Sequence, residues 1–330
     1  MRRLFLGRPL VVSVVAALAL TACGGAETNT TTPDTANNGL EKSTLTVGIV
    51  AVPDSAPIQI AIDKGFFKAE GLTVSASVET GGATATPKLV AGQLDAMLGN
   101  YVSLFSAQEK GVGKFKVVAD SYQAAPDNFV LMANGDNAEI SSPADLAGKK
   151  IAVNTLNGIG TLAVTATAKV AGVTIDPKQF VPMPLPDMGA ALKNGTVDVI
   201  WVAEPFISAN ARDGAKKIAD SMSGPMADFP IAGWVMSDDF VAKNPNTVAA
   251  FQRALAKAQQ LAASDRKAIE EVLPKYTKID AATAAVIALG VYSTTLSEAR
   301  LQRVADTMKE YGYLQAGFDV KSLLHAPAAG

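Results

Sequence analysis

Short apolar runs alternate with stretches of helical spacing along most of the chain. Seven runs are rich in β-branched and other apolar residues, and helical patterns lie between them. This alternation is typical of βαβ units, so the pattern predicts an α/β protein with mostly parallel sheets. The predicted strands cover residues 45–50, 72–78, 95–98, 116–119, 150–153, 180–183 and 197–201.

Two stretches of this pattern echo each other, at residues 89–97 and 191–199. In each, a helical segment ends at a glycine, and an aspartate three residues later opens a buried strand. Glycine suits the left-handed conformation at a helix end, so each copy is typical of a helix C-cap that leads into a strand. The repeat predicts two similar α/β lobes, although ordinary loop chemistry between helices and strands also produces short matches of this kind.

The last part of the chain has a different character. From residue 238 to 311 the sequence is an Ala-rich helical pattern, in which Val248, Phe251, Leu255 and Ala258 recur at helical spacing. We expect these helices to be packing elements and not ligand contacts.

The first residues have the layout of a secretory signal. Three arginines precede an uncharged apolar run over residues 10–20, which is too short for the roughly 20 residues of a membrane-spanning helix. Small residues then lead to Cys23, in a pattern that resembles the bacterial lipobox, where the cysteine is diacylated. We therefore expect residues 1–22 to be a lipoprotein signal peptide, with lipidation at Cys23, and residues 23–43 to be a flexible tether. Both general secretion and twin-arginine export fit this signal.

Charge and residue inventory narrow the classes of function. The formal net charge is −2, and loss of the three arginines with the signal moves it to −5, so no nucleic-acid partner is expected. A single cysteine excludes an internal disulfide, and the single histidine, His325, lies in a Pro/Ala-rich end. Serine–histidine, cysteine–histidine and histidine–metal chemistry are therefore not expected. We predict a protein that is not an enzyme, with no catalytic residue, cofactor or metal; only a carboxylate-dependent catalyst stays open.

Five blocks of the chain carry a family likeness, in the same order as in that family. They resemble the nitrate, sulfonate and taurine binding proteins, a family that also includes binders of thiamine-precursor pyrimidines. Together the blocks span nearly all of the chain after the tether. They are AIDKGFFKAEGLTV (61–74), AGQLDAMLGN (91–100), SPADLAGKKIAV (142–153), NGTVDVIWVAEPF (194–206) and DDFVAKNPNTVAAF (238–251).

The resemblance implies a type II periplasmic-binding-protein fold. In this fold two α/β lobes are joined by a two-strand hinge, and a helical C-terminal part packs on the first lobe. By that analogy lobe 1 covers residues 44–130 and takes back residues 231–330, while lobe 2 covers residues 131–230. The crossover strands would lie near residues 129–133 and 231–236.

The same resemblance implies a function. The chain would be an extracytoplasmic solute-binding lipoprotein of an ABC importer, anchored to the cell membrane and acting as a monomer with permease and ATPase subunits. Its ligand would be a small organic anion such as an aliphatic sulfonate or taurine, with a thiamine-precursor pyrimidine or nitrate as alternatives. A lipoprotein that senses a ligand for a signalling receptor would have the same sequence, so this class stays open.

Loops at the carboxyl ends of strands are the candidate binding residues. Ligands of open α/β sheets bind there, where loops lead into helix N-termini whose free N–H groups can hold an oxyanion. Arg212 is the single arginine between residues 45 and 250, so an anion would be held mainly by N–H groups, hydroxyls and helix dipoles. The candidates are Asp54, Ser55, Gly81, Gly82, Ala83, Asn100, Tyr101, Thr155, Asn157, Gly158 and Thr161.

Three further candidates have two interpretations each. Glu204 follows a buried strand and is a possible partner for a ligand amine or ring nitrogen; equally, it is a possible cap of its own helix, with Pro205 next. Trp201 and Trp234 are possible flat walls of the pocket, or plain core residues.

Overall fold

The computed structural model describes residues 39–315 and 317–325 of the 330-residue chain. Residues 37–330 form one compact unit, and its described strands form two separate sheets. Cys23 and the expected signal peptide lie outside the described residues, as does most of the expected tether. Among the described residues, no helix combines the length and the apolar character needed to cross a bilayer.

The first sheet has six strands in the order β11-β4-β10-β3-β1-β2. Strand β1 pairs in parallel with both β2 and β3, whereas β10 runs antiparallel between β3 and β4. The strands are β1 (Thr44–Val50), β2 (Thr73–Glu79), β3 (Ala96–Asn100), β4 (Phe115–Gln123), β10 (Pro230–Ser237) and β11 (Val291–Tyr292).

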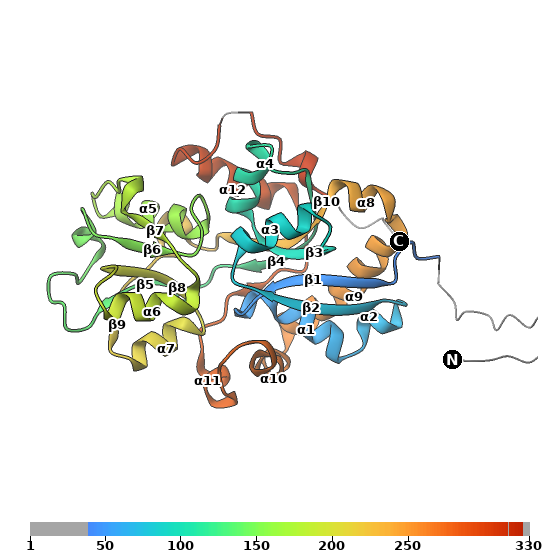
Figure 1. Cartoon of the computed structure of the whole chain (residues 1–330), viewed down its shortest axis with the longest axis horizontal. Helices are drawn as coiled ribbons and strands as arrows, with labels where there is room; N and C mark the ends of the chain where they lie inside the picture. Colours follow the sequence, from blue (N-terminus) through green and yellow to red (C-terminus); the bar gives the residue numbers. More distant parts are fainter. Residues whose placement is uncertain (1–38, 316, 326–330) are drawn as a thin grey trace, which may run out of the picture. The chain divides into compact units, whose positions relative to one another are not determined.

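The second sheet has five strands in the order β7-β6-β8-β5-β9. Strand β6 pairs in parallel with β7 and β8, and β5 runs antiparallel between β8 and β9. The strands are β5 (Phe129–Asn134), β6 (Ile151–Val153), β7 (Phe180–Pro182), β8 (Val199–Ala203) and β9 (Ala215–Asp220). Figure 1 shows this sheet, in green and yellow, apart from the blue and teal strands of the first.

The two sheets repeat one topology. In each, three parallel strands are followed by an antiparallel strand and then by an outer strand: β2-β1-β3-β10-β4 matches β7-β6-β8-β5-β9. The antiparallel strand is in each case the one that enters from the other sheet, after the connection from β4 to β5 or from β9 to β10. The prediction of mostly parallel sheets is therefore wrong, because this entering strand runs opposite to its neighbours and contributes antiparallel pairs on both sides.

The two stretches of the short sequence repeat, residues 89–97 and 191–199, have equivalent positions in the two lobes. The Asp95 N–H donates to the Thr46 carbonyl, and the Asp95 carboxylate accepts from the Thr46 N–H, both at 2.9 Å. Asp198 makes the same two bonds with Lys150, at 2.9 and 2.7 Å. The glycine three residues before each aspartate is left-handed, with φ of 71° and 73°. Each copy of the repeat thus ends a helix. It also links the residue before β3 to β1, or the residue before β8 to the start of β6.

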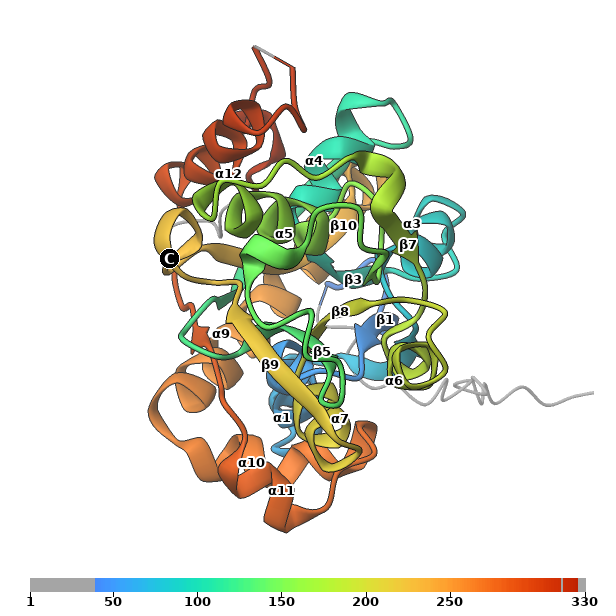
Figure 2. The same ribbon diagram turned by 90° about the vertical axis from the view of Figure 1, so that its left-hand side faces the viewer.

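Helices cover both sheets, and the C-terminal helices return to the first lobe (Figures 1 and 2). Helix α9 packs on α1 and α2, and α12 packs on α4. All four apolar positions predicted from helical spacing in α9 are fully buried. The first-lobe helices are α1 (Ala56–Asp63), α2 (Phe66–Ala69), α3 (Gly82–Val90), α4 (Tyr101–Glu109), α8 (Asp238–Lys243), α9 (Pro245–Ser264), α10 (Arg266–Tyr276), α11 (Ala281–Val286) and α12 (Glu298–Glu310); those of the second lobe are α5 (Ile159–Val170), α6 (Leu185–Lys193) and α7 (Phe206–Arg212).

Candidate functional site

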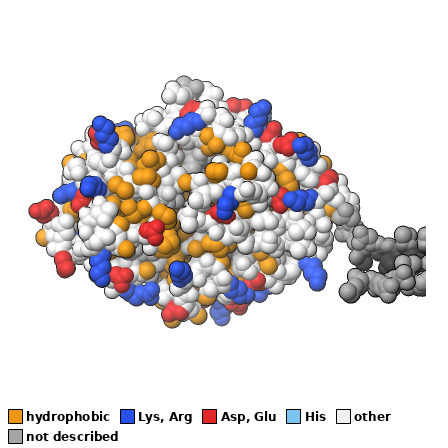
Figure 3. All heavy atoms as spheres, in the orientation of Figure 1, with side chains coloured by type: hydrophobic (Ala, Val, Ile, Leu, Met, Phe, Trp, Pro, Cys, Tyr) orange, Lys and Arg blue, Asp and Glu red, His pale blue; other side chains and the backbone are white. Residues whose placement is uncertain are grey.

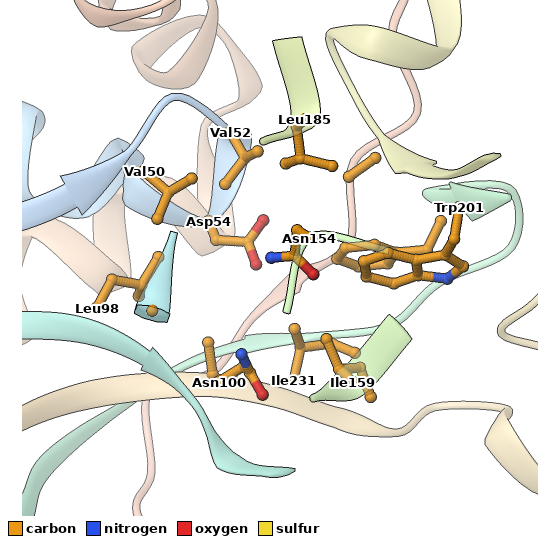
Figure 4. A pocket seen from close by; sticks show the side chains of 14 residues that line it. Val50, Val52, Asp54, Leu98, Asn100, Asn154, Ile159, Leu185, Trp201 and Ile231 are labelled. Carbon is orange, nitrogen blue, oxygen red and sulfur yellow. The ribbon is translucent and has the colours of Figure 1, made fainter. Parts of the chain in front are cut away.

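A cavity lies between the two lobes, and both of them line it (Figure 4). Its volume is about 60 Å³. Since one water needs roughly 10–15 Å³ on this measure, the cavity has room for a few waters or one small solute. The lining residues are Val50, Val52, Asp54, Gly82, Leu98, Asn100, Phe129, Asn154, Ile159, Leu185, Trp201, Ala203, Ile231 and Ala232.

The polar lining residues come from the carboxyl ends of parallel strands. Asp54 lies in the short 3₁₀ turn Pro53–Ser55 after β1, Asn100 ends β3, and Asn154 follows β6. The strand order brings these ends to one edge of each sheet, and the two edges face each other across the cavity. Most of the remaining wall is apolar.

Asp54 is the one carboxylate among the described lining residues. The residue is only 4% exposed, and its Oδ1 atom has no hydrogen-bond partner. Burial raises the pKa of Asp54 to about 7, and a bond from its own backbone N–H opposes this only in part. A carboxylate in this setting is poised to change charge near neutral pH.

The C-terminal part of the chain holds the Asp54 turn in place. The Tyr276 hydroxyl of α10 donates to the Val52 carbonyl at 3.0 Å, and the Tyr292 hydroxyl of β11 donates to the Pro53 carbonyl at 2.9 Å. The Ser121 hydroxyl donates to the Asp54 carbonyl at 3.2 Å. The late helices were predicted to be packing elements and not ligand contacts; through Tyr276 of α10, together with Tyr292 of β11, this part of the chain positions a residue of the cavity.

Trp201 forms a flat wall of the cavity. Its ring stacks on Phe129 with centroids 5.3 Å apart and an interplanar angle of 9°, and its Nε1 donates to the Ser221 hydroxyl at 3.0 Å. Gly160 lies against the other part of the indole, where an added Cβ would come within 2.7 Å of a ring carbon. The ring is therefore held by packing on two sides and by a hydrogen bond at its edge.

The structure brings four of the predicted site residues to the cavity: Asp54, Gly82, Asn100 and Trp201. The Asn100 side-chain oxygen accepts from the Ser103 N–H at 2.8 Å and so begins α4. A second hollow, of about 240 Å³, adjoins at Gly82 and is lined by three more of them, Ala83, Thr155 and Asn157.

Five of the other predicted residues have structural contacts and do not line the cavity. The Ser55 hydroxyl accepts from the Val50 N–H at 3.1 Å, and the Tyr101 hydroxyl donates to Asp120 at 2.6 Å within the core of lobe 1. Gly81 precedes α3. The Thr161 side chain accepts from the Gly158 N–H at 3.1 Å and so caps the start of α5.

The last two, Glu204 and Trp234, also lie away from the cavity lining. Trp234 is fully buried in the first sheet, on β10. The Glu204 carboxylate accepts from the Ser208 N–H at 3.1 Å and from the Ser208 hydroxyl at 2.8 Å. Burial raises the pKa of Glu204, and these two bonds and the charge of Arg212 oppose the rise. This geometry favours the capping interpretation of Glu204 over pairing with a ligand.

Sequence reasoning missed Asn154 and most of the apolar wall. Asn154 directly follows β6, just as Asn100 ends β3. The expectation that ligands bind at the carboxyl ends of strands therefore applies to Asn154, but the predicted loop began one residue later, at Thr155. The apolar members, such as Leu185 and Ile231, gave no signal, because they look like any other core residue in the sequence.

Metal ligands do not gather anywhere in residues 39–315 and 317–325: no group of three His, Cys, Asp or Glu side chains is close enough to hold an ion. On the face drawn in Figure 3, Lys and Arg side chains are interspersed with Asp and Glu. This face thus carries no continuous patch of a single charge.

The chain is similar in sequence to a known family of proteins. A family model described as NMT1/THI5 like matches residues 52–269. The taurine-binding periplasmic protein of Escherichia coli (strain K12) is 30% identical over 220 residues, which are 64% of this chain and 65% of that protein. The nitrate/nitrite binding protein NrtA of a Nostoc species is 26% identical over 244 residues, which are 67% of this chain and 54% of that protein.

Solved structures support the fold. The alkanesulfonate-binding protein SsuA from Xanthomonas axonopodis pv. citri, bound to MOPS, superposes with a TM-score of 0.72 at 17% identity, over 87% of this chain and 99% of that one. This likeness, together with the repeated sheet topology, confirms the predicted periplasmic-binding-protein fold of two α/β lobes with a helical C-terminal part on the first.

Proposed function

The chain belongs to the NMT1/THI5-like family, and from this premise we propose that it is the solute-binding protein of an ABC importer. The observation that carries the proposal is the cavity of about 60 Å³ between the lobes, whose buried polar atoms on Asp54 and Asn154 lack partners among the described residues. Buried polar groups are nearly always hydrogen-bonded, so these atoms indicate a place prepared for a ligand. The named relatives bind taurine, nitrate or nitrite, and alkanesulfonates.

We propose further that the protein binds its solute and does not transform it. The ligand class is a small sulfonate or taurine, with nitrate and thiamine-precursor pyrimidines as alternatives. Lobe 1, residues 44–130 with 231–330, and lobe 2, residues 131–230, would close over the solute about the two connections between the sheets. The closed monomer would then deliver the solute to permease and ATPase subunits at the outer face of the membrane.

Thermal shift with a ligand panel tests the proposed function. The mature protein is expected to gain thermal stability with taurine or an alkanesulfonate, because a ligand that binds only the native state stabilises it by mass action, by about 2.7 kcal/mol at 100 times Kd. Nitrate, bicarbonate and aminopyrimidines complete the panel. Glucose and leucine serve as unrelated solutes that should give no shift. Stabilisation by an unrelated solute, with none from the panel, would contradict the proposal.

Membrane attachment through Cys23 is a second expectation. One acyl pair on a glyceride supplies a strong anchor, so the wild-type protein is expected in the membrane fraction and the Cys23→Ser protein in the soluble fraction. Fractionation of cells that express each form, followed by immunoblotting, measures this. A Cys23→Ser protein that is still processed and still sediments with membranes would rule out this anchor.

A further inference from the structure

The cavity contains a carboxylate that forms no ion pair with any described residue. Asp54 is 4% exposed, and the described lining residues include no Lys, Arg or His. A buried charge without a partner costs several kcal/mol, so a protein keeps one mainly where a ligand supplies the opposite charge. The hydroxyls of Tyr276 and Tyr292 donate to the backbone carbonyls of Val52 and Pro53, and neither donates to the Asp54 carboxylate.

A second acceptor reaches the same space from the opposite lobe. The Asn154 side-chain oxygen is buried and has no hydrogen-bond partner. Figure 4 shows the side chains of Asp54 and Asn154 close together within the cavity, with the Asn154 nitrogen on the side of Asp54 and the Asn154 oxygen turned away from it. Asp54 and Asn154 thus each bring an unpaired acceptor to the cavity, one from each lobe, and a ligand group with several N–H bonds can donate to both.

The aromatic wall fits the same ligand chemistry. Trp201 and Phe129, whose rings are stacked on each other, both line the cavity. The face of an indole ring attracts cations, by about 0.5–2 kcal/mol depending on desolvation. A positively charged group in the cavity thus has a favourable neighbour as well as two acceptors.

Hydroxyl groups lie in the hollow that adjoins the cavity at Gly82. Ser103 and Thr155 line the adjoining hollow, which shares Gly82 with the cavity, and both hydroxyl oxygens are buried without partners. Helix α3 begins at the same Gly82, with its N–H groups toward this region. An acidic group at the far end of a short ligand meets donors here, whereas at Asp54 it would meet a carboxylate.

We infer that the ligand carries a protonated nitrogen, which pairs with Asp54 and Asn154, and that it is therefore an aminated small molecule and not a simple inorganic or alkyl anion. The inference rests on the proposed function and narrows its ligand class. The opposing arrangement is a protonated Asp54 that donates to an anion without nitrogen. The two arrangements respond oppositely to pH and to loss of the carboxylate.

A matched pair of ligands and a matched pair of variants test the inference by calorimetric titration. Taurine and isethionate differ only in an ammonium group that replaces a hydroxyl. Asp54→Asn removes the unpaired carboxylate, and Glu204→Gln removes a buried carboxylate that lies outside the cavity lining and is already bonded to Ser208. Wild type and Glu204→Gln are expected to bind taurine about 100-fold more tightly than isethionate, as in other sites where a buried polar group loses its partner.

The Asp54→Asn substitution should remove the preference for taurine over isethionate. Asp54→Asn is expected to lose about 100-fold in taurine affinity and to bind isethionate as well as the wild type or better, because a repulsive charge is gone. The wild-type affinity for taurine should fall between pH 8 and pH 6, as Asp54 gains a proton. Tyr122, Tyr276 and Tyr292, which lie around the turn, stay neutral over this range because burial raises their pKa values. The charged group that acts on Tyr122 and Tyr292 from α10 is Arg266.

Other outcomes are equally decisive. Taurine affinity that is unchanged in Asp54→Asn, or tighter binding of isethionate than of taurine by the wild type, would overturn the inference. If the wild type binds neither compound, the variants are titrated with the panel member that does stabilise it. If that member has no N–H group, as with an alkanesulfonate, nitrate or bicarbonate, the inference is overturned and the proposed function stands. If it is aminated and its binding needs Asp54, both are supported. Absence of binding by every panel member counts against the proposed function, and the inference falls with it.

Discussion

The ligand-free Asp54→Asn protein is expected to be more stable than the wild type at pH 8, by up to about 4 kcal/mol. Burial raises the pKa of Asp54 from its ordinary value of 3.8 to about 7 in the folded protein. Between these values the folded protein holds a proton that the unfolded chain has released. The stability linked to this proton is fully present below about pH 4 and is lost as the pH rises through 7. Three pKa units correspond to roughly 4 kcal/mol at 1.36 kcal/mol each.

Urea unfolding of both proteins at pH 5.5, 6.5, 7.5 and 8.5 measures this effect. The free energy of unfolding of the wild type should decrease across the series relative to that of Asp54→Asn. Glu204→Gln is the matched control: loss of a helix-capping carboxylate should reduce stability by at most about 1 kcal/mol. A difference between wild type and Asp54→Asn that does not depend on pH would contradict the prediction. A gain in stability together with a loss of affinity would mean that the protein holds Asp54 in an unfavourable state for the sake of its ligand.

The largest loss of stability is expected for Asp120→Ala. This carboxylate is fully buried and accepts from the Tyr101 hydroxyl and from Arg300 Nε, both at 2.6 Å. It also accepts from the Ser121 N–H at 2.9 Å. Removal of one partner of a buried ion pair leaves the others unpaired and typically costs about 3–5 kcal/mol. The network ties β4 to α4 and α12, so its loss should loosen the first lobe as a whole.

Denaturant unfolding at pH 7 measures the cost, with an exposed ion pair as the control. Asp239 and Lys243 are 2.7 Å apart, but their side chains are 74% and 70% exposed. Asp239→Ala should therefore change the free energy of unfolding by no more than about 0.5 kcal/mol. Asp120→Ala would contradict the prediction if its loss were as small as that of Asp239→Ala. An Asp120→Asn protein should lie between the two, because the amide still fills the space and still accepts one hydrogen bond.

Local patterns were sufficient for the positions of the predicted strands, for the presence of two lobes and for part of the site. The alternation of apolar runs and helical segments placed every predicted strand on or beside an observed one. The repeat at residues 89–97 and 191–199 identified two lobes with equivalent topology. Strand ends followed by Gly, Asn or Asp led to Asp54, Gly82 and Asn100. These features depend on residues close together in the chain, and that is why the sequence reports them.

The direction in which a strand-end side chain points was beyond the sequence. Asn100 and Tyr101 are neighbours, yet the first lines the cavity and the second is buried in lobe 1 against Asp120. Glu204 and Asp54 both follow buried strands, yet one is bonded to Ser208 and the other has an unpaired oxygen. These differences depend on partners that lie far apart in the sequence.

Composition and periodicity by themselves determined the α/β class, the two lobes and the edges where their strands end, because the spacing of apolar residues controls which local structure can be buried. The tertiary structure alone decided which polar groups lie close together. It brought Tyr276 and Tyr292 from the end of the chain onto the turn of Asp54, and it set Asn154 opposite that carboxylate across the cavity. Burial and unpaired polar atoms arise from such long-range contacts, and no local pattern encodes them.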